Sequence, residues 1–207
     1  MIVCQDWIEY VRQILNHACH GYEYYCPVVI PEKKRDRIPA IDRKLLGKYP
    51  MCEWNKDQRY RAKKQGRSNY VYIRWDLSGI LMHTPGIEPV GVSDRFFVLS
   101  EKPYQFRVGS WIEIKIGPAR TGKRFTAYLT KQSFRSIKAL LIENIEKGRF
   151  EEFEKYYYRL ENLPAFSGIL TQISELYRSL KAAIRKAGLT NRGRTLRRLK
   201  LRSWKGQ

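Results

Sequence analysis

Acidic side chains are scarce in this 207-residue sequence, which has 20 Asp and Glu against 40 Lys and Arg, a formal net charge of +20. A folded surface with such an excess of cations repels itself, so we expect a polyanionic partner, and nucleic acid is the most common one. Residues 188–207 contain no acidic side chain at all.

Long apolar runs are also missing, and none approaches the roughly 20 residues that a membrane-spanning helix needs. The opening MIVCQDWIEY lacks the basic segment and apolar run of a signal peptide. We therefore expect a cytoplasmic protein without a membrane partner. The hydrophobic content of 43% and aromatic content of 13% are those of a folded chain.

Two common site motifs are absent. The segment GPARTGKR has the glycine and lysine spacing of a phosphate-binding loop, but Arg124 replaces the Ser or Thr that would hold magnesium, so ATP or GTP hydrolysis is not expected. Structural zinc sites usually show two close ligand pairs, which this sequence does not have. The candidate metal ligands are Cys19, His20, Cys26 and Cys52, and their poor spacing leads us not to expect zinc.

The predicted fold class is α+β. Asp6 is a plausible N-cap for a first helix that ends near Gly21. Residues 27–67 are strongly basic and contain four prolines, so we expect a basic irregular arm laid over the core, with room for a few helical turns.

A block of strands follows the arm. Six segments have the composition or the period-two pattern of strands, namely NYVYIRWD, ILMH, RFFVLS, YQFRVG, SWIEIKIG and RFTAYLTK. The short connections between them, such as LSG, favour an antiparallel sheet of five or six strands.

Three C-terminal helices are predicted after the strands. They cover about residues 131–148, 150–163 and 167–187, and Ser133 is the expected N-cap of the first. We interpret residues 1–187 as one domain and residues 188–207 as a basic tail. Charged tails of this kind are usually solvated until they meet a partner.

Nucleic-acid binding is the function that these features predict, as a part of a DNA- or RNA-processing complex and without a required cofactor. Lys and Arg of the arm and tail would bind phosphates, and nearby aromatic rings could stack on unpaired bases. The expected phosphate-binding residues, with one aromatic residue of the tail, are Lys33, Lys34, Arg35, Arg59, Arg61, Lys63, Lys64, Arg67, Arg192, Arg194, Arg197, Arg198, Lys200, Arg202 and Trp204. The candidate stacking rings in the arm are Tyr49, Trp54 and Tyr60. DNA and RNA both remain open as ligands.

An alternative is a magnesium-dependent nuclease. Asp94, Glu113 and Lys115 could be arranged to resemble the acidic residue and Glu-x-Lys of PD-(D/E)xK nucleases, with Glu9 as a further acid. The acids would hold the ion, and the lysine would orient the attacking water. Ser93 stands where these nucleases have proline.

Two further hypotheses use other residues. His83 and the tyrosines of the YYY segment at 156–158 could supply a metal ligand and a nucleophile, although such sites normally use two histidines. The apolar stripe of the last helix, which includes Ile173, Leu180 and Ile184, could bind a protein partner. Amphipathic helices mostly bury such a stripe within their own domain.

Overall fold

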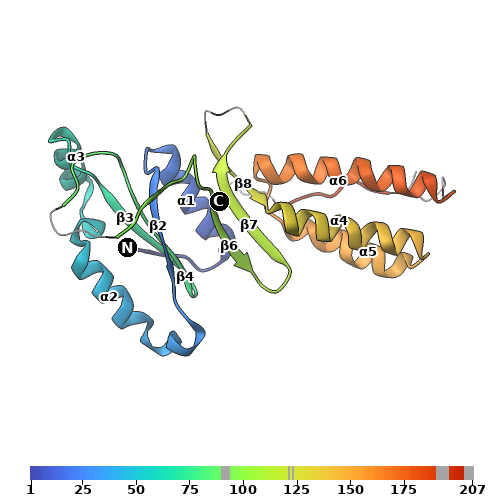
Figure 1. Ribbon diagram of the computed structural model, residues 1–207, viewed down its shortest axis with the longest axis horizontal. Coiled ribbons are helices and arrows are strands. Elements are labelled where there is room, and N and C mark those ends of the chain that lie inside the picture. Colours follow the sequence, from blue (N-terminus) through green and yellow to red (C-terminus); the bar gives the residue numbers. More distant parts are fainter. Residues whose placement is uncertain (90–93, 121, 123, 190–195, 203–207) are drawn as a thin grey trace. The chain divides into compact units, whose positions relative to one another are not determined.

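The α+β fold consists of two compact units, seen in a computed structural model (Figure 1). The structure describes residues 1–89, 94–120, 122, 124–189 and 196–202. Unit 1 is formed by Met1–Phe106 and Ile116–Phe125, and unit 2 by Arg107–Lys115 and Thr126–Gln207. Among the described helices, none has the length and apolar character needed to cross a membrane.

Unit 1 contains a five-stranded sheet in the order β1-β3-β4-β2-β5. The strands are β1 (Ile2–Val3), β2 (Tyr24–Val29), β3 (Tyr70–Trp75), β4 (Ser78–His83) and β5 (Phe97–Val98). The β1–β3 pair is parallel and the other pairs are antiparallel. The predicted single antiparallel sheet is therefore wrong, because this sheet is mixed and the remaining strands form a second one.

The missed strand β2 contains Pro27, a residue that usually marks a break. In the structure β4 pairs with the whole of β2, whereas β5 pairs only with Tyr24 and Tyr25. Pro27 thus lies where β2 has an open edge, and no strand on that side needs its missing N–H. The turn between β3 and β4 is Asp76–Leu77 rather than LSG, since Trp75 pairs directly with Ser78.

The basic arm at residues 27–67 is mainly helical, so the predicted irregular segment with a few helical turns is corrected to a succession of helices. Unit 1 contains the helices α1 (Trp7–Cys19), η1 (Glu32–Arg37), α2 (Ile38–Lys48), η2 (Pro50–Glu53) and α3 (Lys56–Lys64). Proline is tolerated in the first turn of a helix, and Pro39 and Pro50 lie in the first turns of α2 and η2 instead of interrupting them. The expected first helix is confirmed as α1.

The arm covers the sheet through one aromatic-rich cluster. Tyr49, Met51 and Cys52 pack there with Tyr70 and Tyr72 of β3. The helix α1 also packs against β3. All of the first four residues of β3 are buried, so the arm is a structural part of unit 1 and not only a cationic appendage.

A second sheet has three strands in the order β6-β7-β8. They are β6 (Tyr104–Val108), β7 (Ile112–Pro118) and β8 (Phe125–Leu129), and they supply residues to both units. Along β7 the isoleucines are buried, while Glu113 and Lys115 are partly exposed. The predicted period-two alternation of this segment is confirmed.

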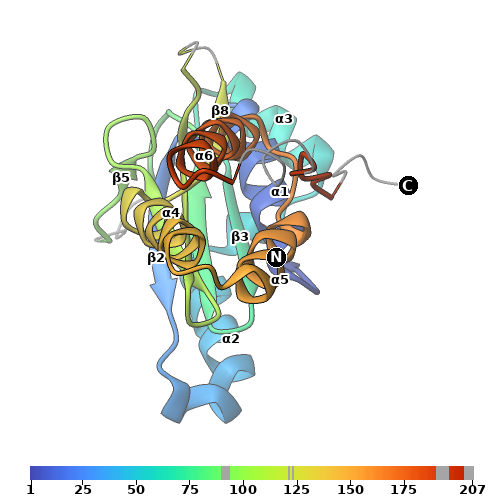
Figure 2. The same cartoon turned by 90° about the vertical axis from the view of Figure 1, so that its right-hand side faces the viewer.

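Unit 2 is dominated by helices that run side by side, and Figure 2 views them nearly end-on. They are α4 (Lys131–Glu146), α5 (Phe150–Arg159), the short η3 (Leu160–Asn162) and α6 (Ser167–Lys186). The N-cap of α4 is Thr130, and Ser133 is buried inside the helix. The apolar stripe of α6, with Ile173, Leu180 and Ile184, is buried in the folded chain.

The basic tail does not remain free over its described part. Residues 196–202, here called the docked segment, form a parallel bridge in which Arg202 pairs with Pro164. The Tyr157 hydroxyl donates to the Arg197 carbonyl at 2.9 Å, and the Tyr177 hydroxyl donates to the Leu196 carbonyl at 3.2 Å. The docked segment is therefore held by backbone contacts as well as by its side chains.

Candidate nucleic-acid interface

The side of helix α3 that faces the rest of unit 1 holds the helix in place. The guanidinium of Arg59 donates to the carbonyls of Trp54 and Cys52 and to the Tyr22 hydroxyl, at 2.9, 3.3 and 3.1 Å. Ala62 is buried beside it, with 4% of its surface exposed. A capping box between Asn55 and Gln58 closes the first turn. These contacts hold the helix in one orientation.

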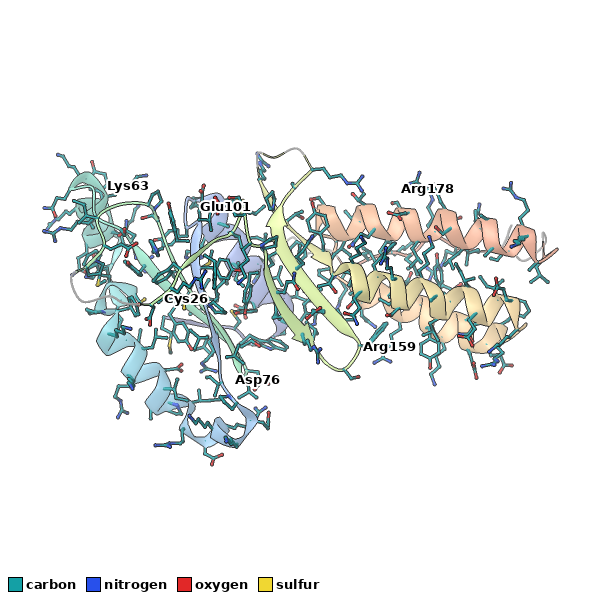
Figure 3. The ribbon with its side chains drawn as sticks, in the orientation of Figure 1. Cys26, Lys63, Asp76, Glu101, Arg159 and Arg178 are labelled. Atoms are coloured by element: carbon teal, nitrogen blue, oxygen red, sulfur yellow. The ribbon has the colours of Figure 1, made fainter. Side chains whose placement is uncertain are left out.

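The outer side of α3 carries three lysines around a tyrosine. Lys56 lies four residues before Tyr60, and Lys63 and Lys64 lie three and four residues after it, so all four share one face of the helix. We call this set the α3 face. Tyr60 is 69% exposed. Figure 3 shows Lys63 at the end of α3, with the side chain directed away from the strands.

The lysines of the α3 face have no acidic partner within the described residues. Every described ion pair involves other cations. Arg61 and Arg67 are exposed nearby and are equally unpaired in that part of the chain. An array of unpaired cations on a fixed helix is the arrangement that phosphates neutralise best, because binding then breaks no existing ion pair.

Other arm residues are less available than the sequence suggests. Arg35 bridges Glu32 and Asp76, and Arg59 has the structural contacts given above. Lys33 and Lys34 are exposed. Of the predicted stacking rings, Tyr49 and Trp54 belong to the aromatic cluster beneath the arm. Tyr60 alone of these three is presented to solvent.

A second basic surface, besides the α3 face of unit 1, is formed in unit 2 by the docked segment. Its Arg197 pairs with Glu161 at 3.1 Å, and the backbone N–H of Lys200 donates to the same carboxylate at 2.9 Å. Arg198 lies over the Tyr177 ring at 5.5 Å, and Lys181 of α6 lies 5.1 Å from the same ring.

The remaining predicted residues of the tail fall into two groups, those that the structure describes and those that it does not. Lys200 and Arg202 have exposed side chains. Figure 3 shows Arg178 on the outer side of α6. The predicted residues Arg192, Arg194 and Trp204 lie outside the described part of the chain.

The nuclease candidates are distributed over the two units. Asp94, in unit 1, accepts hydrogen bonds from Lys48 Nζ and the Tyr49 hydroxyl, at 2.7 and 2.5 Å. The Lys48 ammonium, followed by the Tyr49 hydroxyl, lowers the pKa of Asp94. Glu113 and Lys115 share one face of β7 in unit 2. The structure thus gives Asp94 a role in binding the arm, and the nuclease remains a hypothesis.

The side chains proposed as metal ligands have different environments. Cys19 and His20 are exposed at the end of α1, whereas Ala18 lies on the buried side of this helix. Cys52 is buried in the cluster beneath the arm, which raises the pKa of its thiol to about 12 and disfavours the thiolate that binds metals. Within the described residues no group of three or more His, Cys, Asp or Glu is placed to hold an ion.

His83 belongs to the aromatic core of unit 1. Its ring stacks between those of Tyr24 and Tyr70, with centroid distances of 4.8 and 4.9 Å, and Phe96 meets its edge. The side chain is only 2% exposed, and burial lowers its pKa. His83 therefore packs in the aromatic core, where burial favours its neutral form.

A cavity of about 680 Å³ lies between α2, η2 and β3 in unit 1. Its buried charged group, Asp42, accepts from the Tyr72 hydroxyl and from Arg74 Nε, each at 3.0 Å. The carboxylate and the guanidinium satisfy each other there. Arg43 and Glu53 also line the cavity, which therefore carries charges of both signs, whereas the charged side chains of the α3 face are all cationic.

The sequence-based prediction did not include Lys56, and it did not group the four residues of the α3 face as one surface. The spacing of Lys56, Tyr60 and Lys64 at four-residue intervals was visible, but it has meaning only on a helix. The sequence predicts only short helical turns in the arm, and a short turn does not bring all four side chains onto one face.

Comparisons with known proteins supply no relative for this chain: no family model, no curated protein and no solved structure matches it.

Proposed function

We propose that this protein binds nucleic acid, with the α3 face as the principal phosphate-binding surface and the exposed cations of the docked segment as a second one. The observation that carries the proposal is the α3 face itself, where three lysines without a described acidic partner surround an exposed ring. The net charge of +20 gives the same preference over the whole chain. Such contacts position a protein on a polynucleotide without reading its sequence.

The test is a titration of short labelled DNA and RNA oligonucleotides, followed by fluorescence anisotropy at low and moderate salt. Binding that weakens steeply with added salt is expected, since each phosphate contact releases a counterion. Anionic lipid vesicles and an acidic polypeptide are the competitors. If the protein binds these but no polynucleotide, the proposal is wrong.

The same samples test the nuclease alternative. In magnesium, cleavage by the parent protein that is lost in the Glu113→Ala variant, with binding retained, would assign the function to an enzyme instead. An uncleaved oligonucleotide would leave a binding protein.

A further inference from the structure

We infer that the α3 face binds single-stranded rather than double-stranded nucleic acid, with Tyr60 stacking on an unpaired base. This inference rests on the proposed function. Three features of unit 1 support it: the exposure of the ring, its position among cations, and the rigidity of the helix that presents it.

Exposure singles out Tyr60. Among the described residues, large hydrophobic side chains with high exposure include only one aromatic residue, and it is Tyr60 at 69%. Other rings of unit 1 are engaged in the core, as Tyr49 and Tyr70 are at a centroid distance of 5.4 Å. Since most of its surface is exposed, the Tyr60 ring is available to stack on a ligand.

The ring is central among the cations. On the α3 face the lysines precede and follow Tyr60 by one helical turn. A strand whose phosphates contact lysines on both sides would pass its bases over the ring. Proteins that bind single strands combine cationic and aromatic side chains in this way, and a stack is insensitive to sequence because every base has a π-face.

A duplex does not fit this arrangement as well. Its base faces are covered by stacking, and only phosphates and groove edges are accessible. The lysines would still contact a duplex, but Tyr60 would add little. The effect of a Tyr60 substitution on single-strand affinity, compared with its effect on duplex affinity, therefore measures the contribution of the ring.

The helix α3 is also preorganised, because its orientation is fixed in the absence of a ligand. Arg59 and the capping box fix α3 on its inner side, where Asn69 Nδ2 additionally donates to the Arg59 carbonyl at 3.1 Å. Little conformational freedom of the backbone is then lost on binding. Ile87, which pairs with Arg67 just beyond α3, is also 69% exposed.

The experiment compares Tyr60→Leu and Tyr60→Phe with the parent protein on matched single-stranded and duplex oligonucleotides. Tyr60→Leu should weaken single-strand binding by about 5- to 150-fold, the value of one base stack, and leave duplex binding within about twofold. Tyr60→Phe keeps the ring and should retain most of the affinity. Tyr156→Leu, on the partly exposed Tyr156 of α5, is the matched control and should change neither.

The outcomes separate the two proposals. Equal effects of Tyr60→Leu on both ligands, or no effect on either, would overturn the single-strand inference while nucleic-acid binding stands. Absence of binding by the parent protein to any polynucleotide would overturn the proposed function itself. Circular dichroism of each variant identifies any loss of fold.

Discussion

The α3 face and the docked segment are both basic, but the structure holds them in opposite ways. The cations of the α3 face project from a helix fixed by the hydrogen bonds of Arg59 and by a capping box, and they have no acidic partner among the described residues. In the docked segment Arg197 is paired with Glu161, and the backbone itself is bonded to unit 2. Charge alone therefore does not tell which basic region is free to bind a ligand and which one also stabilises the fold.

Removal of residues 190–207 should have the largest effect on stability. It deletes the hydrogen bonds to Tyr157 and Tyr177 and the pairing of Arg202 with Pro164. We expect a loss of about 2 to 4 kcal/mol of unfolding free energy, or about 5 to 10 °C in melting temperature. A solvated tail would contribute almost nothing, so an unchanged thermal melt would contradict the docked arrangement.

The corresponding change in the α3 face should leave stability intact. The triple variant with Lys56, Lys63 and Lys64 replaced by Gln removes exposed, unpaired side chains, and such surface changes usually stay within about 0.5 kcal/mol. Its melting temperature is the control for the truncation. A drop as large as that of the truncated protein would remove the distinction between the two regions.

A smaller effect is expected for Glu161→Gln. This change frees the Arg197 guanidinium and weakens the acceptor for the Lys200 N–H. Stability should fall by about 0.5 to 1 kcal/mol. Affinity for nucleic acid should rise slightly, because one more cation becomes available. Glu154→Gln, at an exposed position of α5, is the matched control; an identical response of both variants would show that the Glu161 contacts are unimportant.

The pH dependence of stability should distinguish the two units, with the smallest effect of the series. All three histidines lie in unit 1, and burial lowers the pKa of both His17 and His83 there. A histidine with a lowered folded pKa binds more protons when unfolded, so its stabilising effect is present above about pH 6.5 and is lost as the pH falls below it.

Hydrogen exchange measured at about pH 7 and about pH 5.5, corrected for intrinsic rates, should show loss of protection in β3 and β4 but not in α4 or α6. The His83→Phe variant keeps an aromatic ring between Tyr24 and Tyr70 and should reduce the difference. Equal loss of protection in both units would assign the pH effect to other groups.

Local patterns predicted much of this fold, because periodicity and caps act over short distances. The predicted extent of the last helix, residues 167–187, agrees with Ser167–Lys186 within a residue. The β7 segment has the predicted alternation for the same reason. The parallel pairing of β1 with β3 joins residues about 70 positions apart, and no local pattern encodes it.

The candidate sites were harder to predict, because the tertiary fold decides which side chains are exposed and free to bind a ligand. Tyr49 and Tyr60 have similar basic neighbours in the sequence, yet one is buried beneath the arm and the other is exposed. The excess of Lys and Arg indicated a polyanionic ligand, whereas the contacts of Arg35 and Arg59 could be identified only in the fold.

The salt dependence of binding tests the central claim most directly. The dissociation constant for a single-stranded oligonucleotide is measured over a range of salt for the parent protein and for the triple Gln variant of the α3 face. Replacement of Lys147, Arg149 and Lys155 by Gln removes the same charge from a surface where Glu143 and Glu152 balance it, and is the control. The account predicts that the logarithmic salt slope falls by about 2 in the α3 variant and stays unchanged in the control. An unchanged slope in the α3 variant, or an equal decrease in both, would contradict it.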